Sequence, residues 1–479
     1  MKALTHILPI GDGEGDHAKH GGGAGASAPG FAGRPLHRLR RSPSPRFARG
    51  GWAFAAALLA TPSLAATTAI TGGTVAIGDG SAPIPNGTVV FADGRIVAAG
   101  ANVQVPAGAQ VIDAHGKWVS AGMVAGFSTL GLADSEGVEE SNDVSAGKSP
   151  FNAAIDISPA INPNSIILNN ERWGGVTRAV VSPGTGGSIF AGQGAVISLG
   201  VGPDPVMRPR AFQYVEMGED GAQAAGGSRP AAYAMLHDAL AQAQDYRRNP
   251  AAFGGRERDS LIKRPDAQAL IAVLDGKQPL LVHVQRASDI RSVLALKKDY
   301  PQLKLVLVGA EEGWLVARDI AAAHVPVIAA ALVDLPESFE RVAATESNVG
   351  RMEQAGVTLG ISTVDASAPG SQRNLKQFAG NLVAITKIPG STGLDWGHAF
   401  AAITSGPAQV MGMDGEIGSL RPGRRADVVV WDGDPLELAS APVAVFIDGR
   451  PQPQGSRQTE LRDRYMTPQE GALPKAYER

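Results

Sequence analysis

Residues 417–430 read Ile-Gly-Ser-Leu-Arg-Pro-Gly-Arg-Arg-Ala-Asp-Val-Val-Val, and they say more about the architecture of the chain than any other stretch. The Pro-Gly turn in this stretch runs into an apolar strand over 426–431. A second apolar run, 443–447, is followed by Asp448-Gly449-Arg450. Because Asp-Gly between apolar runs is a strong hairpin signal, this end of the chain is predicted to be β-structure.

The N-terminal part has a similar pattern. Residues 69–77 and 87–91 are short apolar runs, and Asp93-Gly94-Arg95 is a second hairpin signal. Two β-rich ends that flank a long middle region indicate that they fold together. We therefore predict one small β-sandwich built from residues 67–120 and 413–450.

The middle region, 121–412, alternates apolar runs with segments of helical spacing, which is typical of βαβ units and a parallel sheet. The predicted strands are 178–182, 195–199, 279–284, 303–309, 325–330 and 357–362. The predicted helices are 231–247, 264–275, 287–299, 313–323, 337–355, 371–386 and 395–410. For about 290 residues, the simplest α/β architecture is a closed (β/α)8 TIM-like barrel. Residues 202–230 are interpreted as an inserted loop and 451–479 as a polar C-terminal tail.

Composition excludes several kinds of chemistry. The 479 residues include no Cys, so disulfides, thiolate metal sites and cysteine nucleophiles are excluded. The formal net charge of −3 gives no electrostatic reason to expect nucleic acid as a partner. Aromatic residues make up only 5%, which predicts a core of aliphatic side chains.

Residues 1–66 are interpreted as a leader with a secretory signal peptide. Arginines concentrate between 38 and 49, the apolar run 52–59 follows, and small residues occupy much of 61–66. The apolar run is too short to span a bilayer, which takes a helix of about 20 residues. We therefore expect an exported protein, located in a bacterial periplasm, with no integral membrane span after signal removal.

These features together resemble the metal-dependent amidohydrolase superfamily, and within it the imidazolonepropionase-like branch. The resemblance rests on 417–430, on the turn at Asp93-Gly94-Arg95 and on residues 396–413, WGHAFAAITSGPAQVMGM. It implies a His-x-His on the first barrel strand, Lys or Glu on the fourth, a His on each of the fifth and sixth, and an Asp on the eighth. In the family these residues hold one or two divalent metals, zinc or another, which activate water to attack a C–N bond.

The chain departs from that ligand set. The segment that matches the first strand is 121–132, AGMVAGFSTLGL, with Phe127 and Thr129 at the two histidine positions. Gly309 stands at the sixth-strand histidine. The fourth strand is assigned to residues 178–199, which contain neither Lys nor Glu. A mononuclear zinc site takes about three protein ligands, so a degenerate metal site is predicted.

His283, after Leu-Leu-Val in an apolar strand, is the one candidate metal ligand, and no resident cofactor is expected. Asp365 is the candidate water-activating residue, although an alignment shifted by two places Thr363 there instead. The candidate substrate pocket comprises His283, Arg286, Ser182, Gln193 and Thr129.

Two functions stay open. The first is a hydrolase of non-peptide C–N bonds in small molecules such as cyclic amides, imidazolones or dipeptide-like substrates. The alternative is a catalytically silent barrel that binds a ligand or pairs with an active homologous amidohydrolase subunit. Expected partners are a small-molecule substrate or ligand and either a second copy of the chain or that homologous subunit.

Overall fold

The computed structural model describes residues 67–135, 138–253, 260–364, 369–455 and 457–466. The predicted leader, 1–66, lies outside the described residues. Within the described part, no helix is both long enough and apolar enough to cross a membrane.

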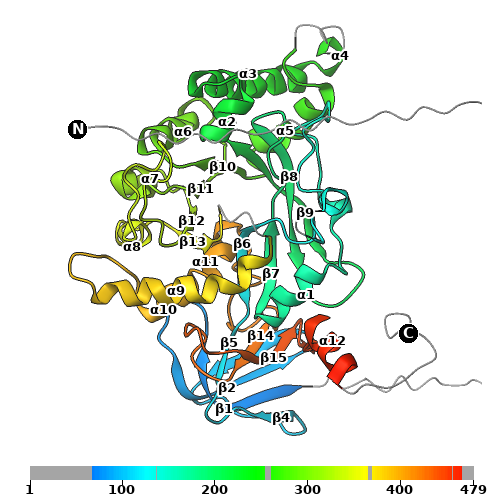
Figure 1. Cartoon of the computed structure of the whole chain (residues 1–479), viewed down its shortest axis with the longest axis vertical. Helices are drawn as coiled ribbons and strands as arrows, with labels where there is room; N and C mark the ends of the chain where they lie inside the picture. The colour runs from blue at the N-terminus through cyan, green and yellow to red at the C-terminus, as the bar shows by residue number, and fades with distance from the viewer. Residues whose placement is uncertain (1–66, 136–137, 254–259, 365–368, 456, 467–479) are drawn as a thin grey trace, which may run out of the picture. The chain divides into compact units, whose positions relative to one another are not determined.

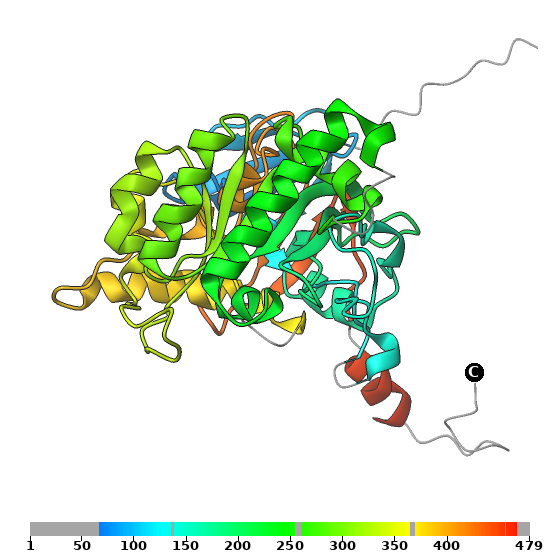
Figure 2. The same ribbon diagram turned by 90° about the horizontal axis from the view of Figure 1, so that it is seen from above.

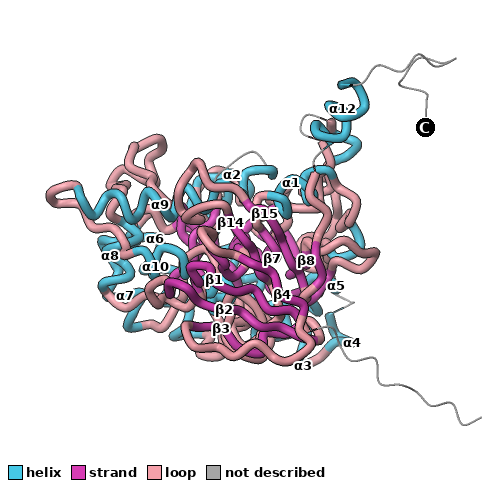
Figure 3. The backbone as a smooth tube through the Cα atoms, turned by 90° about the horizontal axis from the view of Figure 1, so that it is seen from below, coloured by secondary structure: helices cyan, strands magenta, loops and turns pink. Residues whose placement is uncertain are grey.

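Both ends of the chain contribute to one sheet, as predicted. Its order is β16-β15-β14-β5-β1-β2-β3, with β4 also paired to β1. The strand β14 pairs antiparallel with β5, which joins the two ends (Figures 1 and 3). The strands are β1 (Thr68–Ala76), β2 (Ile84–Ala92), β3 (Arg95–Gly100), β4 (Gln110–Asp113), β5 (Trp118–Ala121), β14 (Val428–Trp431), β15 (Pro442–Ile447) and β16 (Arg450–Pro451).

The middle region forms a second sheet of eight strands, and the predicted barrel class is confirmed. Its strands follow one another in chain order from β6 to β13. Seven run in the same direction, whereas β8 is antiparallel to β7 and to β9. The strands are β6 (Met123–Ser128), β7 (Val176–Val181), β8 (Phe190–Ser198), β9 (Val206–Glu216), β10 (Leu280–Val284), β11 (Leu305–Gly309), β12 (Val327–Ala330) and β13 (Leu359–Ser362).

The interpretation of 202–230 as a loop was wrong. This segment contains β9, the longest strand of the barrel, followed by the short helix α2 (Glu219–Ala224). Pro209 between two arginines hides the strand pattern in the sequence, but the neighbouring half of β9 is fully buried. A strand that is buried on both faces lacks the polar alternation by which half-buried strands are recognised.

The first and last barrel strands meet through side chains and a bridging loop. Ser362 Oγ donates to the carbonyl of Phe127 (2.7 Å) and accepts from its N–H (3.0 Å). The predicted helix 395–410 is broken into α10 (Trp396–Ala401) and α11 (Ser405–Val410). The break frees the carbonyls of residues 402 and 403, which accept from Ile361 and Val124 on the two edge strands.

Helices cover the outer surface of the barrel strands (Figure 2). The remaining α-helices are α1 (Ile166–Trp173), α3 (Arg229–Arg248), α4 (Pro250–Phe253), α5 (Arg264–Leu274), α6 (Ala287–Asp299), α7 (Ala317–Ala322), α8 (Asn348–Gln354), α9 (Leu375–Ala384) and α12 (Arg457–Met466). Most predicted helices are found at their expected places. Besides the broken helix 395–410, the prediction differs at 337–355, where only α8 is an α-helix. The helix α12 lies within the predicted polar tail.

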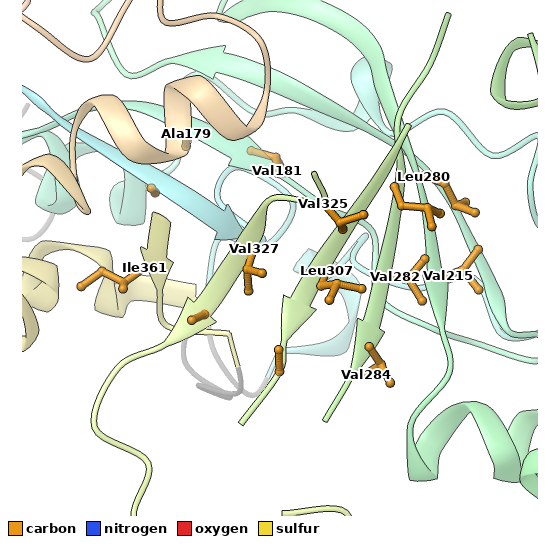
Figure 4. Packing of buried hydrophobic residues seen from close by; sticks show 14 of the residues in the cluster. Ala179, Val181, Val215, Leu280, Val282, Val284, Leu307, Val325, Val327 and Ile361 are labelled. Atoms are coloured by element: carbon orange, nitrogen blue, oxygen red, sulfur yellow. The ribbon is translucent and has the colours of Figure 1, made fainter. Parts of the chain in front are cut away.

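Side chains alternate between the two faces of the barrel strands and so form two separate hydrophobic clusters. Val215, Val282 and Val284 belong to the cluster between the strands and the outer helices (Figure 4). Tyr214 and Leu281 belong to the other cluster, which fills the barrel interior. Because strand side chains alternate, residues two positions beyond Tyr214 and Leu281 also face the interior.

A buried arginine connects the two sheets. Arg178, on β7, donates through Nε and Nη2 to the two carboxylate oxygens of Asp427 (2.7 and 2.6 Å), just before β14. Its Nη2 also donates to Asp448 (2.8 Å), in the turn after β15. The side chain of Arg178 is only 1% exposed, so the pair is fully desolvated.

Candidate active site at the barrel mouth

Two polar side chains lie at the carboxyl ends of neighbouring strands and are candidates for a functional site. Glu216 is the last residue of β9, and His283 is the residue opposite it in the β9–β10 register. Both follow interior-facing residues by two positions, so both face the barrel. The His283 Nδ1 lies 2.8 Å from the Glu216 carboxylate. In parallel barrels the carboxyl ends of the strands form the usual active-site face.

Hydrogen bonds at both ring nitrogens orient His283. Gln285 Oε1 accepts from the backbone N–H of Glu311 (3.3 Å), which fixes the orientation of the Gln285 amide. The amide nitrogen of Gln285 therefore faces His283 Nε2 at 2.9 Å and donates to it. Nδ1 is the ring nitrogen that faces Glu216. The imidazole is thus held between a carboxylate and a buried amide.

Glu216 is held by several donors. It is 4% exposed and accepts from the Gly218 N–H (2.9 Å) and the Tyr214 hydroxyl (3.1 Å), in addition to His283. Tyr214 packs against Phe127, with ring centroids 5.2 Å apart. Sequence reasoning missed Glu216 because its strand was interpreted as a loop. The signal that could have found it is the stretch 211–215, Ala-Phe-Gln-Tyr-Val, which is apolar except for Gln213 and ends in a single carboxylate.

A second buried carboxylate, on a loop outside β9 and β10, lies close to Glu216. Glu340, which lies between β12 and α8, is 6% exposed and accepts from the Glu219 N–H (2.8 Å) and from Arg229 (3.3 Å). A Cβ added to Gly218 would stand 2.8 Å from Glu340 and 3.0 Å from Glu216. The carboxylates of Glu340 and Glu216 therefore both lie close to Gly218. Burial raises the pKa of Glu340, and the negative charges of Glu219 and Glu216 act in the same direction.

Charged residues near Glu340 and Gly218 form a network of ion pairs. Arg229, at the start of α3, contacts Asp289 (3.0 Å) as well as Glu340 and Glu219 (3.6 Å). Arg286 precedes α6 and contacts Asp289 at 2.9 Å. The predicted pocket residue Arg286 therefore lies in this network, one residue beyond Gln285.

The other predicted pocket residues lie in different places. Thr129 directly follows β6, and the buried Ser182 directly follows β7, where its hydroxyl donates to the carbonyl of Pro183. Gln193 is bonded to Gln278, which precedes the first residue of β10, at the opposite end of that strand from His283. The structure therefore does not bring Gln193 to the mouth.

The eighth-strand candidates follow β13. Thr363 comes directly after Ser362 and accepts from Ser371 (3.2 Å) and from Gln372. Asp365 lies outside the described residues, so its candidate role stays a prediction.

The assignment of the fourth strand to 178–199 was wrong. Those residues form β7 and part of β8, the second and third strands, whereas β9 is the fourth. The fourth strand therefore does supply a carboxylate, Glu216. At the sixth-strand position, Gly309 has φ +89°, and a Cβ there would stand 2.6 Å from Gln285 Oε1. The Gln285 amide occupies the space beside Gly309.

The described donors do not fit the metal centre that the resemblance implies. Phe127 offers no lone pair, Gly309 offers no side chain, and both ring nitrogens of His283 are hydrogen-bonded within the protein. Among the described residues, no three His, Cys, Asp or Glu side chains are grouped so that they could hold a metal ion.

The barrel is joined to a composite sheet and carries Glu and His on its fourth and fifth strands, and the sequence comparisons support a likeness to the metal-dependent amidohydrolase superfamily. A model of the amidohydrolase family matches residues 316–452. An amidohydrolase structure from Thermotoga maritima MSB8 superposes with a TM-score of 0.69 and 21% identity, covering 80% of this chain and 99% of that one. This last likeness concerns the fold.

Two curated relatives are similar in sequence. The amidohydrolase tasK of Hapsidospora irregularis is 24% identical over 385 residues, which cover 73% of this chain and 38% of the relative. The imidazolonepropionase of Maricaulis maris is 34% identical over 106 residues, which cover 22% of this chain and 25% of the relative. The chain thus spans well under half of the length of each relative.

Proposed function

We propose that the protein is a hydrolase of non-peptide C–N bonds in small molecules, such as cyclic amides, imidazolones or dipeptide-like compounds. We further propose that His283 and Glu216, rather than a metal-bound water, carry the chemistry. The observation that carries this proposal is the 2.8 Å contact between the His283 imidazole and a buried carboxylate at the barrel mouth. Likeness to the amidohydrolase superfamily supports the reaction class.

In the proposed reaction, substrate displaces the Gln285 amide from His283 Nε2. The freed nitrogen takes a proton from a water molecule as the water oxygen bonds to the carbonyl carbon. Glu216 stabilises the imidazolium that forms, as a carboxylate behind a histidine does in other hydrolases. The imidazolium then returns the proton to the leaving nitrogen as the C–N bond breaks.

The test is turnover of a panel of small cyclic amides, imidazolones and dipeptides by the wild type and by two variants. His283→Asn and Glu216→Gln are each expected to lower kcat by about 10²–10⁴-fold, because proton transfer by a positioned group contributes that much. His237→Asn, an exposed histidine on α3, is the matched control and should keep full activity. If His283→Asn keeps wild-type turnover, the assignment is wrong.

The second candidate function is a catalytically silent barrel that binds a ligand or pairs with a homologous amidohydrolase subunit. The observation that favours it is the Gln285 amide bonded to the nitrogen of His283 that would act as the base. Co-expression with a full-ligand homologue would test it. A stable complex, with activity only in the homologue, would favour this candidate over the hydrolase.

We also propose that the protein acts after export to a bacterial periplasm. The proposal rests on the order of basic, apolar and small residues within 1–66. Fractionation of a bacterial host that expresses the full chain tests it. A processed form in the periplasmic fraction is expected, and an unprocessed form confined to the cytoplasm would contradict the proposal.

A further inference from the structure

We infer that a cavity among the helices outside the barrel binds a small organic molecule that carries a phosphate group. The cavity has a volume of about 580 Å³, which is within the usual range for small-molecule sites. Its walls come from α6, from the short 3₁₀-helix η3 (Gly313–Val316), from the start of α7 and from α8. Figure 1 shows α6, α7 and α8 in succession along one side of the barrel. No lining residue belongs to the candidate site at the barrel mouth, so the inference is independent of the proposed function.

Positive charge exceeds negative charge on the walls of this cavity. The lining includes three guanidiniums, those of Arg291, Arg318 and Arg351. The one lining carboxylate, that of Asp319, accepts from Arg291 Nε at 2.9 Å. Within the described residues, neither Arg318 nor Arg351 forms an ion pair with a carboxylate. The cavity therefore carries two positive charges that only a bound anion would match.

An aromatic ring holds Arg351 in place. Its guanidinium carbon lies 4.5 Å from the centroid of the Trp314 ring, which is a cation–π contact. The indole is fixed in turn, because its Nε1 donates to the carbonyl of Ala343 (2.8 Å) and the backbone N–H of Trp314 donates to Asn348 Oδ1 (2.9 Å). A guanidinium that stacks through its face keeps its N–H donors in its plane. Arg351 thus offers oriented donors on the cavity wall, and an anion that binds there restricts the side chain little further.

The size and the charge of the cavity together favour a phosphate ester. A phosphate monoester carries a charge of about −1.5 to −2 at pH 7 and has three strong acceptor oxygens, which suits two unmatched guanidiniums. Guanidiniums also match the geometry of phosphate oxygens by donating two parallel hydrogen bonds. The cavity is larger than a phosphate group alone, and Leu315 and Ala355 supply apolar surface on its walls. These apolar side chains would contact the organic part of the ligand.

Calorimetry on the full chain, in a phosphate-free buffer, tests the inference with phenyl phosphate and phenol as matched probes. The two probes share the ring and differ in the phosphate, so we expect phenyl phosphate to bind and phenol to show no measurable binding. Added NaCl should weaken the binding of phenyl phosphate, because the attraction is electrostatic. Arg318→Gln and Arg351→Gln should each weaken it at least about fivefold, because each removes a charge-assisted hydrogen bond. Arg264→Gln, at an exposed position at the start of α5, is the control and should bind as the wild type does.

Arg318→Gln is the deciding variant, because its side chain is exposed and the change does not disturb the contact between Arg351 and Trp314. Unchanged affinity in Arg318→Gln, equal binding of the two probes, or no binding of phenyl phosphate would each overturn the inference. An equal loss in Arg264→Gln would mean that anions are attracted without a specific site, which would also overturn it. Weaker binding of phenyl phosphate in His283→Asn would place the ligand at the barrel mouth, with the same consequence.

Discussion

At the scale of single residues, Gln285, Gly309 and His283 share one space at the barrel mouth. Gln285 is completely buried, and its amide lies between the ring of His283 and the backbone of Gly309. A histidine at position 309 would require this amide to move. The glycine at position 309 is thus coupled, through the Gln285 amide, to the hydrogen bonding of His283.

Gly309→Ala tests this coupling. The new Cβ would stand 2.6 Å from Gln285 Oε1, so the variant should lose about 1–3 kcal/mol of unfolding free energy through overpacking, beyond any backbone strain. Gly356→Ala is the matched control, because its φ of +85° is similar and nothing lies within 4 Å of its added Cβ. Urea denaturation of both variants measures the difference. Equal losses would show that Gln285 does not fill this space.

The titration of Glu340 gives a second prediction. Burial raises its folded pKa above the ordinary value of 4.5, so the folded state binds more protons than the unfolded state in the range just above pH 4.5. The contribution of this group to the unfolding free energy therefore falls as pH rises through that range. Glu340→Gln should make the fall less steep in urea denaturation at several pH values. A steeper fall in the variant would contradict the sign.

At the scale of elements, closure of the barrel depends on one side chain and one helix break. Ser362 links the ends of β13 and β6, and the carbonyls freed between α10 and α11 bond to the same two strands. Backbone groups at the two edges of the sheet thereby find hydrogen-bond partners, although no backbone ladder joins β13 to β6. This explains why a helix that the sequence predicts as continuous over 395–410 stops at residue 401.

Ser362→Ala should cost about 1–3 kcal/mol, because it leaves the buried N–H and carbonyl of Phe127 without this partner. Ser292→Ala, on the exposed side of α6, is the control and should change stability by less than about 0.5 kcal/mol. Chemical denaturation compares the two. No loss in Ser362→Ala would mean that the bridge does not contribute to closure.

The pattern of buried and exposed residues in each element decides whether the sequence predicts it. The strands β10 to β13 are short apolar runs separated by helical segments, so their positions and the inward direction of His283 were predictable. The strand β9 was not, because Pro209 and its flanking arginines resemble a loop. Because β9 was not predicted, Glu216 at its end was not predicted as a site residue either. Glu340 could not be predicted at all, since only the folded chain brings the β12–α8 segment next to Gly218.

At the scale of the whole molecule, the barrel and the composite sheet are joined by a buried ion pair. Arg178→Met should cost about 3–5 kcal/mol, because it leaves Asp427 buried without its partner. Arg247→Met removes a partly exposed pair with Asp275 and should cost at most about 1 kcal/mol. Thermal and urea unfolding of the two variants measure the contrast. Similar losses would mean that the buried pair does not join the two sheets.

We propose that side chains of this amidohydrolase-fold protein, rather than a bound metal, carry the chemistry. The most direct test is turnover of the amide panel by the wild type in the presence of EDTA, with His283→Asn measured in parallel. We predict that the wild type keeps its rate in EDTA, that added zinc does not raise it, and that His283→Asn lowers kcat by about 10²–10⁴-fold. Loss of wild-type activity in EDTA with recovery on adding zinc would contradict the account.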